Sequence, residues 1–222
     1  MMRALVLLSG GQDSSTCLYW AMREYGAAQV CAIGFDYGQR HVEELNYARG
    51  ICDGLGISFA VIALPAVTEL TANALTRKDM VVDAATVGDA PPNTLVEGRN
   101  MLFLMYAAIY AKERGIRTLV TGVSQSDYSG YPDCRDVFIK SLNVTLNLSM
   151  DYEYTIETPL MWRDKAQVWA LAQELGVLDI IRDKTLTCYN GIPGSGCGNC
   201  PACALRRKGY EEYMKSKSNT NP

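Results

Sequence analysis

A glycine-rich turn near the N-terminus carries the residue types that bind phosphate. It directly follows the apolar run Ala4 to Leu8, which predicts a buried strand, and the apolar spacing from Ser14 to Tyr25 predicts a helix after it. Where a strand passes through glycines into a helix, free backbone N–H groups and the helix dipole favour an anion. The alternative is an ordinary turn that only caps the helix. The expected phosphate-binding residues are Leu8, Ser9, Gly10, Gly11, Gln12, Asp13, Ser14 and Ser15.

The type of phosphate loop narrows the chemistry. The chain contains no Gly-Lys pair, which excludes a Walker loop, and Gly10-Gly11 does not continue as G-x-G-x-x-G. The pattern Ser-Gly-Gly-x-Asp-Ser instead resembles the pyrophosphate loop of the N-type ATP pyrophosphatases. That resemblance implies that ATP is cleaved between its α and β phosphates and that an adenylyl group passes to a substrate oxygen. Asp13 is the best candidate to hold Mg²⁺, with simple helix capping as the alternative.

Four cysteines near the C-terminus form a second constellation. Cys197, Cys200 and Cys203 have the spacing C-x2-C-x2-C, and Cys188 precedes them across a turn-rich segment. Thiolates at this spacing can converge on one tetrahedral ion, and a closed set of four leaves no open position for water. We therefore expect a structural Zn²⁺, with an iron–sulfur cluster as the competing interpretation. Because the phosphate loop lies far away in the sequence, loss of the metal should act on stability rather than on chemistry.

The other reactive side chains are less specific. Cys17, Cys31 and Cys52 fall on predicted helices or strands, where cysteine behaves as a small apolar residue. Cys134 lies in a polar loop, where it could be a nucleophile only with a lowered pKa. His41 is the single histidine of the chain, which excludes His-rich metal sites, and it could be a general base or a structural hydrogen-bonding group.

Predicted strands and helices alternate along the chain, which favours an α/β fold with a parallel sheet and helices on both faces. Strands are expected at residues 4–8, 30–35, 59–64, 118–123 and 154–157, and helices at 14–25, 42–55, 99–114 and 164–175. Residues 76–96 read as a long surface excursion. In such sheets ligands lie beyond the carboxyl ends of the strands. The loops 9–15, 36–41 and 124–135 should therefore surround one crevice.

Composition limits the class of protein. The chain has 222 residues, 48% apolar residues and a net charge of −3, so it lacks the electrostatic footprint of a nucleic-acid-binding protein. Its longest apolar run, Met101 to Ala111, is too short to span a bilayer. We expect a cytoplasmic enzyme with no nucleic-acid or membrane partner. We expect an ATP-binding α/β domain at residues 1–182 and, at residues 183–222, a small zinc-binding loop and helix packed on that domain.

Seven segments can be read together as one set of motifs. They are the loop Ser9 to Ser14, Phe35 to His41, Gly98-Arg99-Asn100, Thr121-Gly122-Val123, Asp127 to Arg135, Glu157 to Leu160 and Thr187 to Gly191. Together these motifs resemble the 7-cyano-7-deazaguanine synthase family of queuosine biosynthesis over residues 3 to 214. One departure is Glu97, where the family pattern leads us to expect proline.

The resemblance implies a Rossmann-like sheet of the adenine nucleotide alpha hydrolase-like type and a homodimer. It also implies a carbon–nitrogen ligase that uses ATP to convert 7-carboxy-7-deazaguanine and ammonia into the nitrile. In that chemistry ATP turns the carboxylate oxygen into a leaving group that ammonia displaces. Residues 128–135 would face the deazapurine, and Arg99 would bind its carboxylate. The implied catalytic residues are Asp13, Arg99, Asp133 and Arg135.

Two other classes share parts of this pattern. A tRNA-thiolating enzyme has the same adenylating loop and often carries cysteines, but it needs a basic RNA-binding surface. A zinc-knuckle RNA-binding module would explain the four cysteines, and it leaves everything before Cys188 unexplained.

Overall fold

The centre of the molecule is a five-stranded parallel sheet. The computed structural model describes residues 2–40, 42–70, 73–77, 79–82, 93–126 and 131–220. The strand order is β3-β2-β1-β4-β5, and Val6 pairs with Ala32 on one side and with Val120 on the other. The strands are β1 (Ala4–Leu7), β2 (Val30–Asp36), β3 (Phe59–Ala63), β4 (Thr118–Val120) and β5 (Thr155–Glu157).

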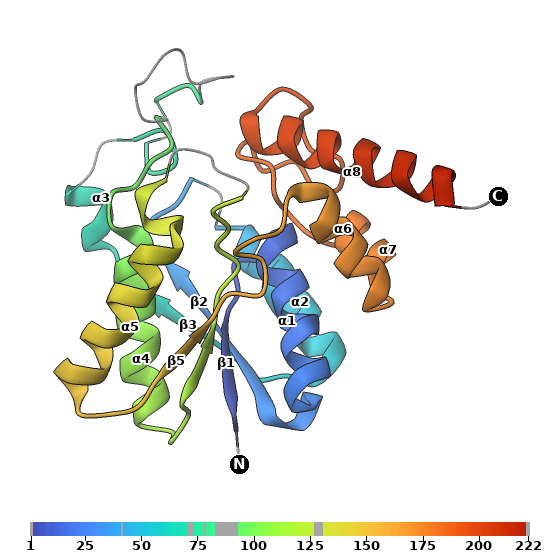
Figure 1. Cartoon of the computed structure of the whole chain (residues 1–222). Coiled ribbons are helices and arrows are strands. Elements are labelled where there is room, and N and C mark those ends of the chain that lie inside the picture. The colour runs from blue at the N-terminus through green and yellow to red at the C-terminus, as the bar shows by residue number, and fades with distance from the viewer. Residues whose placement is uncertain are drawn as a thin grey trace.

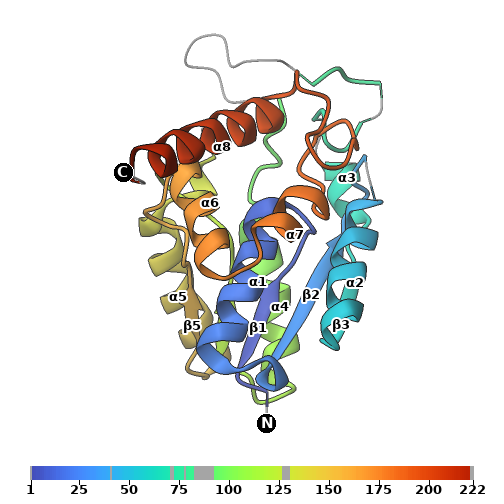
Figure 2. The ribbon, with the colours of Figure 1, turned by 90° about the vertical axis from the view of Figure 1, so that its right-hand side faces the viewer.

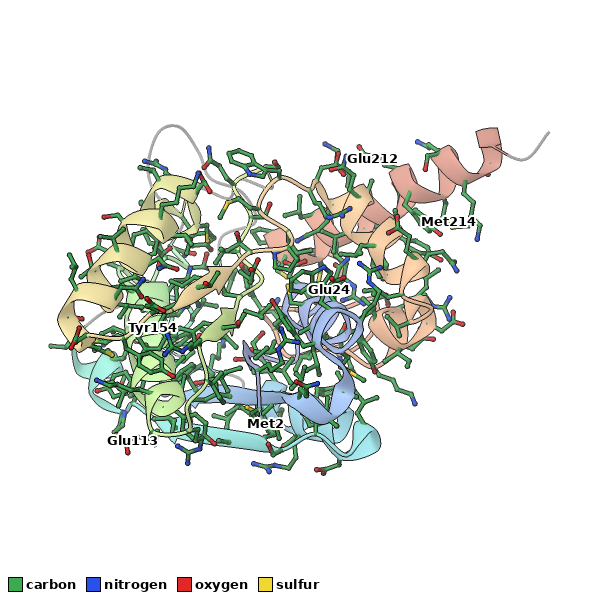
Figure 3. The ribbon with its side chains drawn as sticks, turned by 60° about the horizontal axis from the view of Figure 1, so that its bottom comes forward. Met2, Glu24, Glu113, Tyr154, Glu212 and Met214 are labelled. Atoms are coloured by element: carbon green, nitrogen blue, oxygen red, sulfur yellow. The ribbon has the colours of Figure 1, made fainter. Side chains whose placement is uncertain are left out.

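Helices cover both faces of the sheet (Figure 1). The helices are α1 (Gln12–Tyr25), α2 (Glu44–Leu55), α3 (Ala66–Leu70), α4 (Arg99–Lys112), α5 (Asp136–Met150), α6 (Lys165–Glu174), α7 (Leu178–Asp183) and α8 (Pro201–Thr220). Helices α1, α2, α6 and α7 pack on one face, and α4 and α5 pack on the other. Figure 3 shows Glu113 and Tyr154 on the side of α4 and α5, away from Glu24 near the end of α1.

Alternation along β1 divides the core between the two faces. Ala4 and Val6 join the core under α1 and α2, whereas Leu5 joins the core under α4 and α5. Successive side chains of a strand point to opposite faces, so a strand covered on both sides must be apolar throughout. This requirement explains why β1 and β2 appear in the sequence as continuous apolar runs.

The direction in which the chain winds reverses between β1 and β4. From β1 the chain proceeds outward through β2 to β3, and it then returns to β4 on the other side of β1. Such a switch point separates the two flanking loops and leaves a crevice at the carboxyl ends of the strands. Here Gly122, which follows β4, packs against the start of α1: a Cβ on this glycine would lie 3.0 Å from the carbonyl carbon of Asp13.

The C-terminal segment returns to this same end of the sheet. Helix α8 crosses beyond the carboxyl ends of the strands and packs on α6 (Figure 2). Close approach of the two helices depends on Gly209, because a Cβ there would lie 2.5 Å from the Cβ of Lys165. Tyr213 on the same helix adds its ring to the core beneath α1.

The predicted α/β architecture is confirmed, with local differences. Strand β4 ends at Val120 rather than Val123, because the chain must leave the sheet to bring Gly122 against α1. Helices α3, α5 and α7 were not predicted. The division into units at residues 182 and 183 stays a prediction.

Candidate functional site

The phosphate loop is built around a glycine that no other residue can replace. Gly10 has a φ of +85°, and a Cβ at this position would lie 2.3 Å from the carbonyl oxygen of Glu44. The backbone therefore presses directly on the first turn of α2 in a conformation that L side chains rarely adopt. Gly11 differs, because its φ of −79° is ordinary and its Cβ would contact nothing closer than 3.4 Å.

Two serines close the loop over the start of α1. Ser9 Oγ lies 3.0 Å from Ser14 Oγ, and the Ser9 N–H donates to Ser14 Oγ at 3.2 Å. At the first turn of α1, the Gln12 N–H donates to Thr187 Oγ1, and Ser15 N–H donates to the Gly11 carbonyl. Among the described residues, the N–H groups of Asp13 and Ser14 have no acceptor. A 14-residue helix that begins with free N–H groups is a candidate site for an anion.

Three of the expected loop ligands have side chains that face inward. Leu8, Gln12 and Ser15 are each no more than 2% exposed. Among the described residues, the Gln12 amide and the Ser15 hydroxyl have no hydrogen-bond partner. These residues could reach a phosphate only through their backbone, so any side-chain contact must come from Ser9, Asp13 or Ser14.

Asp13 forms an ion pair with a lysine that the sequence reasoning missed. Lys165 Nζ lies 2.8 Å and 3.1 Å from the two carboxylate oxygens of Asp13. The lysine side chain is only 9% exposed, and α6 supplies it from more than 150 residues away in the sequence. A buried ammonium group at this position balances the charge of the Asp13 carboxylate, and it can also neutralise the charge of a phosphate bound at the loop. The available sequence signal was Gly209, a helical glycine that makes room for this lysine.

Arg99 lies among tyrosines at the start of α4. Its Nη1 donates to the Tyr37 hydroxyl at 3.3 Å, and the guanidinium lies 5.8 Å from the centre of the Tyr37 ring. Burial opposes the charge, but Tyr37, Tyr189 and Tyr131 raise the pKa of Arg99 above its ordinary value. The residue is therefore a fixed cation in an aromatic setting, which suits the recognition of a planar anion.

The other predicted catalytic residues have different surroundings. Asp133 is buried and its Oδ2 accepts the Asn100 N–H at 3.0 Å, so its carboxylate caps α4 beside Arg99. Arg135 is exposed at the start of α5.

Burial raises the pKa of Cys134 to about 11, which keeps it a thiol and disfavours the nucleophile interpretation. His41 and residues 127–130, including Tyr128, lie outside the described residues.

The four cysteines converge as predicted. Their sulfur atoms all lie within 4.8 Å of one another, with Cys200 and Cys203 at 3.3 Å and Cys197 and Cys203 at 3.9 Å. Zn–S bonds of about 2.3 Å in a tetrahedron require sulfurs about 3.8 Å apart, so the set fits a metal ion. The close packing depends on Gly196, since a Cβ there would lie 2.2 Å from Cys203 Sγ.

Backbone donors surround the sulfurs, as expected for thiolate ligands. Cys188 Sγ accepts from the Asn190 and Cys197 N–H groups at 3.3 and 3.4 Å. Burial alone would raise the pKa of Cys197, but donors from Asn199, Asn190 and Cys200 lower it to about 6. A preformed set of N–H···S contacts stabilises negative sulfur, which a bound cation requires.

The metal-binding segment packs directly against the predicted phosphate loop. Leu186 N–H donates to the Gly10 carbonyl at 2.9 Å, and Thr187 Oγ1 accepts from the Gln12 N–H at 3.1 Å. Arg206 of α8 donates to Thr187 Oγ1 at 2.8 Å and also fixes the end of α7. The two segments are far apart in the sequence, and they meet because α8 folds back over the carboxyl ends of the strands.

Comparison with known proteins identifies the family of this chain. The family model described as "Queuosine biosynthesis protein QueC" matches residues 3–214. A curated relative from Clostridium acetobutylicum, named 7-cyano-7-deazaguanine synthase, is 58% identical over 96% of this chain and 95% of its own length. One of the same name from Bacteroides fragilis is 56% identical over 97% of both chains.

A solved structure, an NH3-dependent NAD synthetase from Campylobacter jejuni, is more distant. It superposes with a TM-score of 0.47 and 14% identity, covering 80% of this chain and 67% of that one. In the described part of this chain, no helix is long and apolar enough to cross a membrane. The match of the family model, supported by close relatives named as synthases, shows that the chain belongs to the QueC family of queuosine biosynthesis proteins.

Proposed function

We propose that this chain is an ATP-dependent carbon–nitrogen ligase that converts 7-carboxy-7-deazaguanine and ammonia into 7-cyano-7-deazaguanine. The observation that carries the proposal is the glycine loop at the switch point of the sheet, with Arg99 at the start of α4 near the same edge. The name shared by the close relatives supports the product. We further propose that the enzyme is a homodimer, which sedimentation of the purified protein would test.

The nucleotide would bind with its phosphates at the N-terminus of α1. The free N–H groups of Asp13 and Ser14 would donate to phosphate oxygens, and Ser9 and Ser14 would add hydroxyl donors. Lys165 would offset the charge that develops on the departing pyrophosphate. Mg²⁺ would be held by phosphate oxygens together with Asp13, whose charge Lys165 already balances in part.

The carboxylated base would bind near Arg99. Its guanidinium can pair with a carboxylate, and the half-buried ring of the neighbouring Tyr189 would offer a flat apolar surface for a deazapurine. Asp133 would act indirectly, because it holds the start of α4 from which Arg99 projects. For Arg135 the exposed position supports only a contact at the rim of the site.

The reaction needs two activations of oxygen. A carboxylate oxygen is a poor leaving group, so the carboxylate would first attack the α phosphate and release pyrophosphate. Ammonia would then displace AMP and leave an amide. A second activation, of the amide oxygen, would allow that oxygen to depart and the nitrile to form. The protein would contribute mainly position and preorganised charge.

The zinc would be structural and would be held by Cys188, Cys197, Cys200 and Cys203. Four thiolates complete a tetrahedron, so the metal would supply folding energy to the segment that carries Thr187 and Tyr189. Through these residues it would support the phosphate loop without contacting a substrate.

Product analysis tests the proposal. Incubation with 7-carboxy-7-deazaguanine, ATP and ammonia should yield the nitrile by mass spectrometry, and omission of ATP should abolish it. The competing tRNA-thiolating enzyme would leave this substrate unchanged and would add sulfur to tRNA. The buried position of Arg206, which is engaged with Thr185 and Thr187, speaks against a basic RNA-binding surface at the C-terminal helix.

A further inference from the structure

A half-buried carboxyl group beside the predicted phosphate loop has no part in the mechanism above. Glu44 opens α2, and its carbonyl oxygen is the atom on which Gly10 packs. Its side chain therefore starts at the carboxyl end of β2, next to the loop that would hold the nucleotide. Among the described residues, no lysine or arginine nitrogen lies within 4 Å of this carboxylate.

The carboxyl group is held in one orientation by Gln39. The Gln39 amide nitrogen donates to Glu44 Oε1 at 3.3 Å and to the Phe35 carbonyl at 3.1 Å. Its amide oxygen accepts the Tyr37 N–H at 2.9 Å. Because both ends of this buried amide are occupied, Gln39 cannot turn, and it fixes one oxygen of Glu44. The second oxygen, Oε2, has no partner among the described residues and is not fully buried.

We propose that Glu44 accepts a proton from ammonium and so generates the ammonia that attacks the activated carboxylate. The proposal rests on the function proposed above. At neutral pH ammonia is present mostly as ammonium, which has no lone pair with which to attack. A carboxylate with one oxygen tethered and one open, lying on the same edge of the sheet as the phosphate loop and Arg99, is placed to bind this cation and remove its proton.

The proton balance of the step is complete. Glu44 takes one proton from ammonium, and the freed lone pair forms the new C–N bond at the acyl carbon. The bond between that carbon and the adenylate oxygen breaks, and its electron pair leaves on AMP. A second proton passes from the nitrogen to solvent, which leaves a neutral amide.

The surroundings of Glu44 suit this exchange. The pKa of Glu44 is raised to about 7. Burial is the main cause, and it is opposed in part by the positive charge of Arg99 and the hydrogen bond from Gln39. Tyr37 is the other titratable group that interacts with it among the described residues. A base whose pKa lies near the working pH can both take up a proton and release it in the next turnover.

The test compares Glu44→Gln with Glu43→Gln, a matched change at the exposed neighbouring residue. Three reactions are measured: ATP–pyrophosphate exchange with the carboxylated base alone, nitrile formation with ammonia, and hydroxamate formation with hydroxylamine. Hydroxylamine is a much weaker base than ammonia and is mostly neutral at pH 7. In Glu44→Gln we expect exchange within about twofold of the parent, ammonia-dependent turnover lower by about 100-fold, and hydroxamate formation largely retained.

Other results would overturn the proposal. Unchanged ammonia-dependent turnover in Glu44→Gln would show that the carboxylate takes no proton, and an equal loss in all three reactions would show that it serves folding or binding. Glu43→Gln should match the parent in every reaction. If the parent enzyme itself shows neither exchange nor product, the proposed function fails and this inference fails with it.

Discussion

Thr187 joins the metal-binding segment to the phosphate loop through a single hydrogen bond from the Gln12 N–H, 3.1 Å long. The same hydroxyl oxygen accepts from Arg206 at 2.8 Å. The side chain of Thr187, the residue before Cys188, thus connects α8 to the first turn of α1. The start of α1 is therefore positioned by the C-terminal segment as well as by the strand that precedes it.

Thr187→Val should weaken ATP binding. The change removes the acceptor for the Gln12 N–H at a part-buried position, which costs about 1–3 kcal/mol and frees the first turn of the helix that would bind phosphate. The measurement is the KM for ATP beside the free energy of unfolding in urea. Thr185→Val is the matched control, because Thr185 also accepts from Arg206 but, among the described residues, its hydroxyl forms no hydrogen bond with the loop. Equal KM values in the two variants would contradict the coupling.

The two loop glycines should respond differently to substitution. Gly11→Val should abolish ATP turnover with little change in melting temperature, because its backbone conformation is ordinary and the added side chain blocks the approach of an anion. Gly10→Ala should instead destabilise the protein, since its Cβ would collide with the Glu44 carbonyl oxygen. Circular dichroism and ATP turnover separate the two effects. Full turnover in Gly11→Val would exclude the phosphate-loop assignment.

Much of this architecture can be predicted from the sequence because strands β1 and β2 are buried on both faces and so appear as apolar runs. Helix α5 escapes that reasoning because asparagines interrupt it. In the structure Asn143 Oδ1 accepts from the Ile156 N–H at 2.7 Å, and Asn147 Oδ1 accepts from the Tyr154 N–H at 2.8 Å. Asparagine weakens a helix, but these two side chains accept hydrogen bonds from backbone N–H groups at the edge strand β5. That role depends on tertiary contact and leaves no signal in the local sequence.

The site follows the same division. The phosphate loop and the four cysteines are local patterns, so their spacing alone reveals them. Lys165 belongs to the site only because α8 packs across α6 at Gly209, and a single lysine on a helix otherwise suggests a surface charge. The link between Leu186 and Gly10 likewise joins backbone groups, which leave no signal in side-chain composition.

Gly209→Ala should impair the enzyme through Lys165. The added methyl group would lie 2.5 Å from the Lys165 Cβ, so α8 or the lysine must move, and the ion pair with Asp13 should weaken. We expect a lower melting temperature and a turnover reduced by about 10-fold or more, since a displaced cation no longer offsets phosphate charge. Lys208→Ala, at an exposed position on the same helix, should leave both quantities unchanged. Normal turnover in Gly209→Ala would show that Lys165 is not needed in its present place.

The free energy of unfolding should depend on pH through the titration of Glu44. Burial raises the pKa of this carboxyl from 4.5 to about 7, so the folded state favours the protonated form. Its contribution is therefore most favourable below the unfolded value and is lost as the pH rises through about 7. Urea unfolding at pH 5 and pH 8 should show Glu44→Gln gaining stability relative to the parent at the higher pH. A difference between the two proteins that stays constant with pH would mean that the carboxyl titrates normally.

Removal of the metal should affect ATP binding before the sheet unfolds. The purified protein should contain one zinc per chain, and a chelator or Cys200→Ser should loosen the segment that places Leu186 and Thr187 against the phosphate loop. We expect the KM for ATP to rise while most of the far-UV circular dichroism signal is retained, because the sheet, α4 and α5 stay folded. Loss of activity that only follows global unfolding would favour a purely stabilising role. A brown protein that contains iron and acid-labile sulfide would replace zinc by a cluster and would revive the tRNA-thiolating alternative.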